Sequence, residues 1–117
     1  MLYHLEIAKS TLNKALARSV DQAEVYLISE KKTEIDVLDR KVETLDRIEE
    51  LGMAVRIIKD QRLGFSFSSD LEMNVIDEMI DRAVANAACA APDSCNILPG
   101  PLTTAADLPL FDPAISQ

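Results

Sequence analysis

Residues 51–69, LGMAVRIIKDQRLGFSFSS, decide the fold, because they combine the clearest sheet pattern in the chain with its best helix-start signal. Apolar and smaller side chains alternate on both sides of the polar residues 59–62. Successive side chains of a strand point to opposite faces. We therefore predict a hairpin whose larger residues enter one core, namely Met53, Val55, Ile57, Leu63, Phe65 and Phe67. No glycine adjoins Asp60, so the turn type stays open.

The second face of this hairpin has mostly small side chains. Besides Arg56, it carries Ala54, Ile58, Gly64, Ser66 and Ser68. Small residues permit close approach, so one alternative is that a helix of the same domain lies on them. The other alternative is that a missing domain or a partner subunit covers them. These five residues are the candidate partner contact.

Length, composition and charge narrow the class of protein. A chain of 117 residues with 48% hydrophobic residues fits one folded domain with an aliphatic core. The formal net charge of −8 opposes binding to nucleic acid, because such binding relies on Lys and Arg neutralising phosphates. The sequence has no apolar run of about 18 residues and its start resembles no signal peptide. We expect a cytoplasmic protein that binds neither membrane nor nucleic acid.

The elements before the hairpin are read from periodicity. Residues 2–20 place Leu5, Ala8, Leu12, Ala15 and Leu16 on one stripe, which predicts a helix that ends near residues 19–22. Strands are predicted at 23–28 and 33–37, separated by a polar turn at 30–32.

Residues 41–50 are ambiguous, because their apolar residues lie three apart while both neighbouring segments read as strand. A short helix is the alternative. We favour a strand with a bulge between Leu45 and Ile48, which would return Ile48 to the face of Leu45.

A helix is predicted after the hairpin. Ser69 and Glu72 have the spacing of a capping box, and an apolar stripe continues to about Cys89. Residues 92–117 contain all five prolines and little periodicity, so they form an extended tail. The fold class is α+β, a two-layer sandwich with a mainly antiparallel sheet of four or five strands and two helices packed on it. The domain is assigned to residues 1–91 and the tail to residues 92–117.

Residues for chemistry are scarce. A catalytic zinc ion needs about three protein ligands, and His4 is the only histidine. Cys89 and Cys95 lack ligand spacing and are interpreted as buried or idle thiols. Strand alternation places several of the carboxylates between residues 34 and 50 in solvent. The three glycines are scattered and form no phosphate-binding loop. No catalytic, cofactor-binding or metal-binding residue is predicted.

Several short motifs together resemble the N-terminal domain of the TldD/PmbA family over about residues 5–91. The family pattern reads roughly AEVY, GEVE, LGVRV, GRxGF and SSDLS before a long helix. The matching segments are Ala23-Glu24-Val25-Tyr26, Val42-Glu43-Thr44, Leu51-Gly52-Met53-Ala54-Val55-Arg56, Leu63-Gly64-Phe65-Ser66 and Ser68-Ser69-Asp70-Leu71. The tail segments 92–95 and 106–113 look more like the PmbA (TldE) branch.

The resemblance implies cytoplasmic metallopeptidase assemblies that act on peptides. TldD-type chains of this family carry a zinc-binding HExxxH motif beyond this domain, and PmbA-type partners generally lack it. Members are also linked to microcin peptide maturation and described as modulators of DNA gyrase. The implied role here is structural: an N-terminal domain that contacts its own missing C-terminal domain and a TldD/PmbA-type subunit in a homo- or hetero-oligomer. Zinc is implied for the full assembly and no cofactor for this chain.

Two departures from the family pattern concern turns. Asp39-Arg40 and Asp60-Gln61 stand where the family usually has glycine-containing turns, so both hairpins are expected to be longer or differently bent. The family chain also continues for a whole C-terminal domain, so this chain is expected to be a fragment. The alternative function is a free-standing protein-binding module that uses its sheet face or tail. Reading the parent frame for a homologous C-terminal domain separates the two.

The isolated chain is expected to bind no stoichiometric zinc and to cleave no peptide, because it has one imidazole and its cysteines lack ligand spacing. Calorimetric titration with zinc and a peptidase assay check this expectation. Tight zinc binding that a chelator reverses would contradict it.

Overall fold

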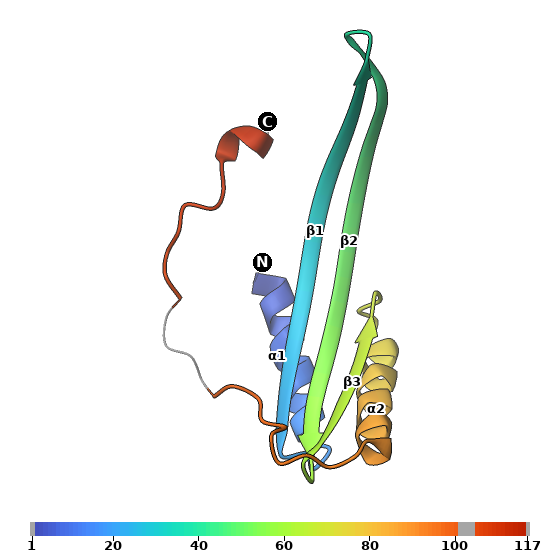
Figure 1. The fold of residues 1–117 in the computed structure, drawn as a ribbon, viewed down its shortest axis with the longest axis vertical. Helices are drawn as coiled ribbons and strands as arrows, with labels where there is room; N and C mark the ends of the chain where they lie inside the picture. Colours follow the sequence, from blue (N-terminus) through green and yellow to red (C-terminus); the bar gives the residue numbers. More distant parts are fainter. Residues whose placement is uncertain (1, 101–104, 117) are drawn as a thin grey trace.

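The computed structural model describes residues 2–100 and 105–116. Its elements are α1 (Leu2–Leu16), β1 (Gln22–Leu38), β2 (Lys41–Lys59), β3 (Arg62–Ser68), α2 (Met73–Cys89) and the short 3-10 helix η1 (Pro113–Ser116) (Figure 1). The strands form one antiparallel sheet in the order β1-β2-β3. The molecule is elongated, with extents of 59 × 30 × 27 Å, because β1 and β2 are far longer than β3.

The predicted α+β class and antiparallel sheet are confirmed, but the sheet has three strands among the described residues instead of four or five. The expected turn at residues 30–32 is wrong, since β1 continues through it and Lys31 pairs with Glu49. This Glu-Lys-Lys run contains no residue with a strong turn preference. Its polarity instead reflects a ribbon that is solvated on both faces.

Residues 41–50 form a strand as predicted, whereas the bulge predicted between Leu45 and Ile48 is wrong. Leu45 lies opposite Ile35 and Ile48 lies opposite Lys32, in uninterrupted register. The register shift occurs farther along, between Asp36 and Val37. Leu45 and Ile48 therefore point to opposite faces, and their three-residue spacing reflects apolar side chains on both faces.

Both hairpins turn through two residues, so the expectation of longer or differently bent turns is wrong. Asp39 and Arg40 have φ of 51° and 63°, and Asp60 and Gln61 have φ of 52° and 63°. Positive φ at both central residues is the geometry of a type I′ turn, whose twist matches that of the flanking strands. Asp tolerates this left-handed conformation, which explains the first of the two positions in each turn.

The turn at Asp60 and Gln61 decides which residues of β2 and β3 share a face. It pairs Ile57 with Gly64 and Val55 with Ser66, so odd positions of β2 lie beside even positions of β3. Directly opposed residues share a face of the sheet. The prediction that the larger residues of both arms enter one core is therefore wrong. Leu63, Phe65 and Phe67 face away from Met53, Val55 and Ile57.

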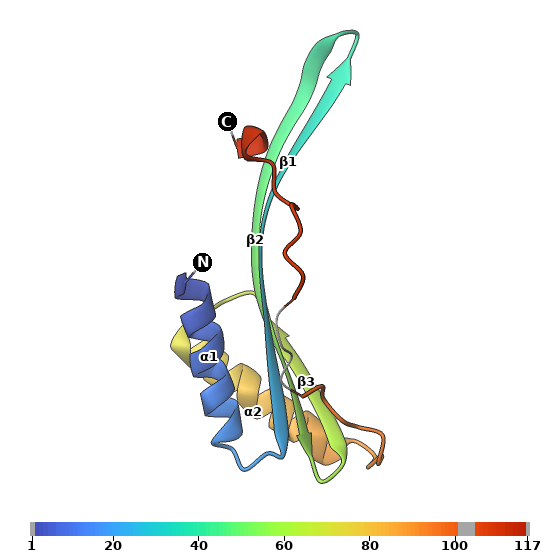
Figure 2. The ribbon, with the colours of Figure 1, turned by 90° about the vertical axis from the view of Figure 1, so that its left-hand side faces the viewer.

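Both helices lie on one face of the sheet, called here the helix face, and the other is called the open face (Figure 2). This arrangement confirms that two helices pack on the sheet. The buried core joins Met53, Val55 and Ile57 of β2 to the inner side of α2. The buried residues of α2 are Ile76, Met79, Ile80, Ala83 and Ala87. Full burial of an aliphatic side chain stabilises the fold by about 1.5–3 kcal/mol, so this aliphatic layer is the main source of stability.

The helix α1 ends at Leu16, earlier than predicted, and Ser19 in the following loop has φ of 58°. Thr11 and Ala15 are its buried residues, whereas Leu5 and Leu16 of the predicted stripe are exposed. The stripe that contacts the core is thus rotated from the predicted one. An ion pair joins Lys14 of α1 to Asp77 of α2 at 3.0 Å, and Arg18, just after α1, pairs with Asp81 of α2.

The helix α2 begins at Met73, and the predicted capping box is wrong. Glu72 precedes the helix without a side-chain cap hydrogen bond. The amide of Glu72 donates to Asp70 Oδ1 at 2.9 Å, and the amide of Asp70 donates to Ser68 Oγ at 3.1 Å. Asp70 thus organises a local turn in place of Ser69.

The C-terminal end of α2 falls at Cys89 as predicted. Arg62 of β3 donates from Nη1 to the carbonyls of Ala88 and Ala90, at 3.2 Å and 3.0 Å. The last carbonyls of a helix lack partners within the helix and favour a nearby cation. The third strand therefore both packs against α2 and satisfies its end.

After α2 the chain crosses the end of the sheet. The amide of Asp93 and the side-chain amide of Asn96 donate to the carbonyl of Gln61, at 2.8 Å and 2.9 Å. The amide of Leu98 donates to Gln22 Oε1 at 3.0 Å. Residues 105–112 have no helix or strand (Figure 1).

The close contact between α2 and β3 generates a stability prediction at Gly64. A Cβ added there would lie 2.0 Å from the carbonyl oxygen of Ala83 and 2.7 Å from the amide nitrogen of Ala87. Both atoms are backbone, so α2 must shift as a unit. We expect Gly64→Ala to lower the free energy of unfolding by about 1–3 kcal/mol, measured by denaturant titration.

The matched control is Gly52→Ala in the neighbouring strand. A Cβ at Gly52 meets its nearest atoms at 3.6 Å and 3.8 Å, which are ordinary contacts. Reduced freedom of the unfolded chain is expected to leave that variant unchanged or stabilised by up to about 1 kcal/mol. Equal destabilisation of the two variants would contradict the packing described here.

Candidate functional site

The five residues predicted as a partner contact do not share one face of the sheet. Gly64 and Ser66 lie on the helix face and are buried, and Ser68 lies on the same face and is half-buried. Ala54 lies on the open face and is half-buried, while Ile58 lies there and is 4% exposed. The assumption of one common surface is therefore wrong.

One alternative was that a helix of this domain covers the small residues. This alternative is correct for the residues on the helix face. Helix α2 lies directly on Gly64, and Ser66 is 6% exposed. A partner would reach these two residues only by displacing α2. Contact of a partner with the other three positions stays a prediction.

The open face instead carries a row of exposed apolar side chains. This open-face patch is formed by Tyr26, Ile28, Leu63, Phe65 and Phe67. The side chain of Phe67 is 69% exposed and its ring centroid is 6.3 Å from that of Phe65. Contiguous apolar surfaces of this kind mark sites of protein contact. No helix covers this face in the described part of the chain (Figure 2).

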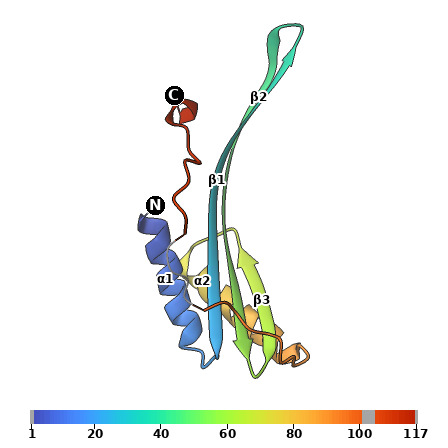
Figure 3. The same cartoon turned by 60° about the vertical axis from the view of Figure 1, so that its left-hand side comes forward.

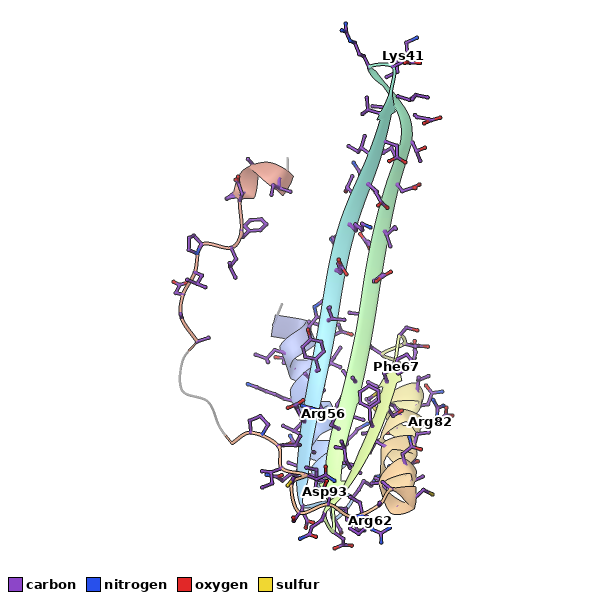
Figure 4. The ribbon with its side chains drawn as sticks, in the orientation of Figure 1. Lys41, Arg56, Arg62, Phe67, Arg82 and Asp93 are labelled. Atoms are coloured by element: carbon purple, nitrogen blue, oxygen red, sulfur yellow. The ribbon has the colours of Figure 1, made fainter. Side chains whose placement is uncertain are left out.

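An ion pair lies within the open-face patch. Glu24 and Arg56 are directly opposite in the β1–β2 register, and Phe65 lies opposite Arg56 on the other side. Arg56 donates to Glu24 Oε1 from Nη2 at 2.5 Å and from Nε at 3.0 Å. Figure 4 shows Arg56 and Phe67 on this part of the sheet. The pair gives an otherwise apolar surface a polar centre, which favours an occupant with both apolar and hydrogen-bonding groups.

The lower end of the open face is already covered by this chain. Leu98 is 7% exposed, and its amide is held by Gln22, the residue directly opposite Ile58. The C-terminal segment is thereby held next to the Gln22–Ile58 pair, where both Leu98 and Ile58 are buried. Tyr26, Phe65 and Phe67 lie beyond this cover and stay exposed.

A groove of about 560 Å³ lies between α1 and the segment that precedes α2. Its polar lining includes Glu6, Ser10, Lys14, Asp70 and Glu72. Lys14 is engaged by Asp77, and Asp70 accepts the amide of Glu72. Lys14 and Asp70 therefore serve the contact between the helices and the local turn.

The described residues bring together no group of three or more His, Cys, Asp or Glu side chains that could hold a metal ion. His4 is half-buried on α1. Cys89 and Cys95 are free and exposed, which shows that the expectation of buried thiols is wrong. Within residues 2–100 and 105–116, no helix combines the length and hydrophobicity that a membrane span requires.

The open-face patch was missed by reading the sequence, although a signal for it was present. A two-residue turn at Asp60 and Gln61 places odd residues of one arm beside even residues of the other. A prediction based on a two-residue turn would have placed Phe65 and Phe67 on the face away from the core.

Comparison with known proteins gives one family and one fold. The family model described as PmbA/TldA metallopeptidase domain 1 matches residues 23–87. A crystal structure of TldE from Thermococcus kodakarensis is similar in fold, with a TM-score of 0.76 and 20% sequence identity. The match covers 87% of this chain and 23% of that chain, so this chain spans less than a quarter of its length. No curated protein matches the chain in sequence.

The two faces predict opposite responses to the same substitution at neighbouring positions. Ser66→Arg places a long cation under α2 and is expected to destabilise the monomer by about 3 kcal/mol or more, because a buried charge without a partner is costly. Phe67→Arg places the cation on the exposed open face and is expected to leave the monomer folded. Thermal unfolding followed by circular dichroism compares them. A folded Ser66→Arg variant would show that the face assignment is wrong.

Proposed function

Because this chain belongs to the PmbA/TldD metallopeptidase family, whose first-domain model matches residues 23–87, we propose that it is the N-terminal assembly domain of a family subunit. In this role it holds the subunit and its neighbours together and carries out no chemistry itself. The observation that carries the proposal is the open-face patch, an apolar sheet surface with an ion pair at its centre. Such a surface fits a protein contact.

The residues present do not fit the metal that the family name implies. His4 is the only histidine of the sequence, and the carboxylates of the described part of the chain are spread along the ribbon. We propose that the zinc site of the assembly belongs to a C-terminal domain, in this subunit or in a TldD-type partner. The chain then contributes to peptide processing by positioning that domain and helping to enclose its site.

Two observations support the finer assignments. The tail segment 106–113 supports placement on the PmbA (TldE) branch. The similarity to a TldE structure at 20% identity supports the shared fold. A cytoplasmic location and a peptide substrate follow from the family resemblance and are part of the proposal.

The occupant of the open-face patch is proposed to be the remainder of a family subunit. Figure 2 shows that the C-terminal segment leaves α2 and passes to the side of the sheet away from the helices. The hydrogen bond from Leu98 to Gln22 fixes the segment at the lower end of this face. The segment then continues past the β1 edge of the sheet (Figure 1), so a domain that follows it would approach the open face from the side of β1.

Fragment complementation tests this function. The tagged chain is expected to co-purify with a separately expressed C-terminal domain of a PmbA/TldD-family subunit and to have no peptidase activity alone. Phe67→Arg is expected to weaken the complex at least about tenfold, because a cation would be desolvated in an apolar contact. The matched control is Asn74→Arg on the exposed side of α2, which is expected to leave the affinity unchanged.

Two results would contradict the proposal. One is the absence of a complex with C-terminal domains of both family branches. The other is peptide cleavage by the purified chain alone that survives further purification.

A further inference from the structure

The middle strand carries two short residues on the open face, between longer side chains of its neighbours. Ala54 lies directly between Tyr26 of β1 and Phe67 of β3. Gly52 lies opposite Ile28, just beyond the end of β3. We call these two residues the Gly52–Ala54 strip. Tyr26 and Phe67 are 63% and 69% exposed, so the strip lies between two aromatic side chains that reach into solvent.

The packing of this domain gives no reason for a glycine at position 52. Gly52 does not have the positive φ that favours glycine, and the register shows no bulge there. A Cβ at this position would meet its nearest atoms at 3.6 Å and 3.8 Å, which are ordinary contacts. Glycine weakens a strand, and without a bulge it often marks a place that another group approaches closely. At Gly64 that group is α2, whereas at Gly52 it must come from outside the described residues.

The ion pair of Glu24 and Arg56 lies next to the strip, toward the lower end of the open face. Both hydrogen bonds of Arg56 go to Oε1 of Glu24. Within the described residues, no hydrogen bond engages Oε2 of Glu24 or Nη1 of Arg56. The side chains of Glu24 and Arg56 are 34% and 43% exposed, so water reaches the pair. An occupant that excludes this water must replace its hydrogen bonds, because a desolvated charged group without a partner is costly.

The chemistry of the occupant follows from these two features. The ion pair offers one acceptor, Glu24 Oε2, and one donor, Arg56 Nη1. A peptide group has the complementary pair, an N–H and a carbonyl oxygen. The strip beside it leaves room for a bulky apolar side chain, which would also contact the rings of Tyr26 and Phe67. The surface therefore fits a polypeptide segment that has a large apolar side chain next to an unpaired peptide group.

We propose that the Gly52–Ala54 strip and the Glu24–Arg56 pair select the segment of the following domain that lies on the open-face patch. A bulky apolar side chain of that segment lies over Gly52 and Ala54, and an adjacent peptide group binds the ion pair. The inference rests on the proposed function, which assigns the patch to the remainder of a family subunit. It adds the residues that recognise this occupant and the chemistry that they recognise.

The following domain is favoured as the source because the contact continues one that this chain already makes. Figure 3 shows the segment after α2 crossing the lower part of the sheet. The amide of Leu98 is held there by Gln22, one pair of residues below Glu24 and Arg56. A domain linked to this segment has a high effective concentration at the open face, which favours it over a free peptide or a second copy.

The affinity for the separately expressed C-terminal domain, measured by isothermal titration calorimetry, tests the strip. Gly52→Leu is expected to weaken binding at least about tenfold, because the added side chain fills the space that the occupant needs. The control Asn74→Leu adds the same side chain on the exposed side of α2 and is expected to leave the affinity unchanged. Circular dichroism should show both variants folded.

Exchange of the two charges separates recognition by the ion pair from a merely structural role. Glu24→Arg alone and Arg56→Glu alone each place like charges in directly opposed positions, so both are expected to weaken the monomer as well as binding. The double variant restores an ion pair, and its thermal stability is expected to return toward that of the wild type. Its donor and acceptor have changed places, so its affinity is expected to stay at least about tenfold below that of the wild type.

The outcomes distinguish this inference from the proposed function. The inference alone is overturned if Phe67→Arg weakens the complex while Gly52→Leu binds like the wild type. It is likewise overturned if the double variant recovers wild-type affinity, since the pair would then act only within the sheet. The absence of a complex between the wild-type chain and C-terminal domains of both family branches overturns the proposed function and this inference together.

Discussion

The turn at Asp60 and Gln61 is the constraint on which the arrangement of the two faces depends. Its two residues, both with positive φ, leave no freedom in the pairing of β2 with β3. The pairing places Gly64 and Ser66 beside Ile57 and Val55 on the helix face. A turn longer by one residue would reverse every side chain of β3 and bring the aromatic residues into the core.

The absence of a side chain at Gly64 is what allows α2 to lie so close to the sheet. The carbonyl of Ala83 occupies the space that a Cβ would need. The alanines on the inner side of α2 have short side chains, which let the helix axis lie close to the sheet. This close approach brings the end of the helix within reach of Arg62, which satisfies its last carbonyls. The same geometry sends Phe65 and Phe67 outward. Tight packing on one face and an apolar surface on the other thus have one cause.

Much of the fold was predictable from local pattern, and the errors share a physical origin. Alternation located the strands and periodicity located α2 to its end at Cys89. Alternation within one strand does not determine the register in which two strands pair. Phe65 and Ser66 were therefore predicted on the wrong faces of the sheet. Strand length was also underestimated, because a charged run such as Glu30-Lys31-Lys32 resembles a turn when the ribbon around it is solvated on both sides. The assumption of one shared surface was wrong for the same reason, since Gly64 and Ala54 lie on opposite faces.

The charge pattern of the long β1–β2 ribbon differs between its two sides. Lys31 and Glu49 lie close across the strands, whereas Glu34 directly opposes Asp46 and pairs instead with Lys32 of its own strand, at 3.2 Å. Selection for stability of an isolated ribbon would favour opposite charges on both sides, because opposed like charges weaken a sheet. The repulsive side instead opposes stacking on that surface, whereas the Ile35–Leu45 pair on the other side carries no such repulsion. Opposed like charges thus disfavour wrong contacts on one side of the ribbon, which is one of the two requirements of specificity.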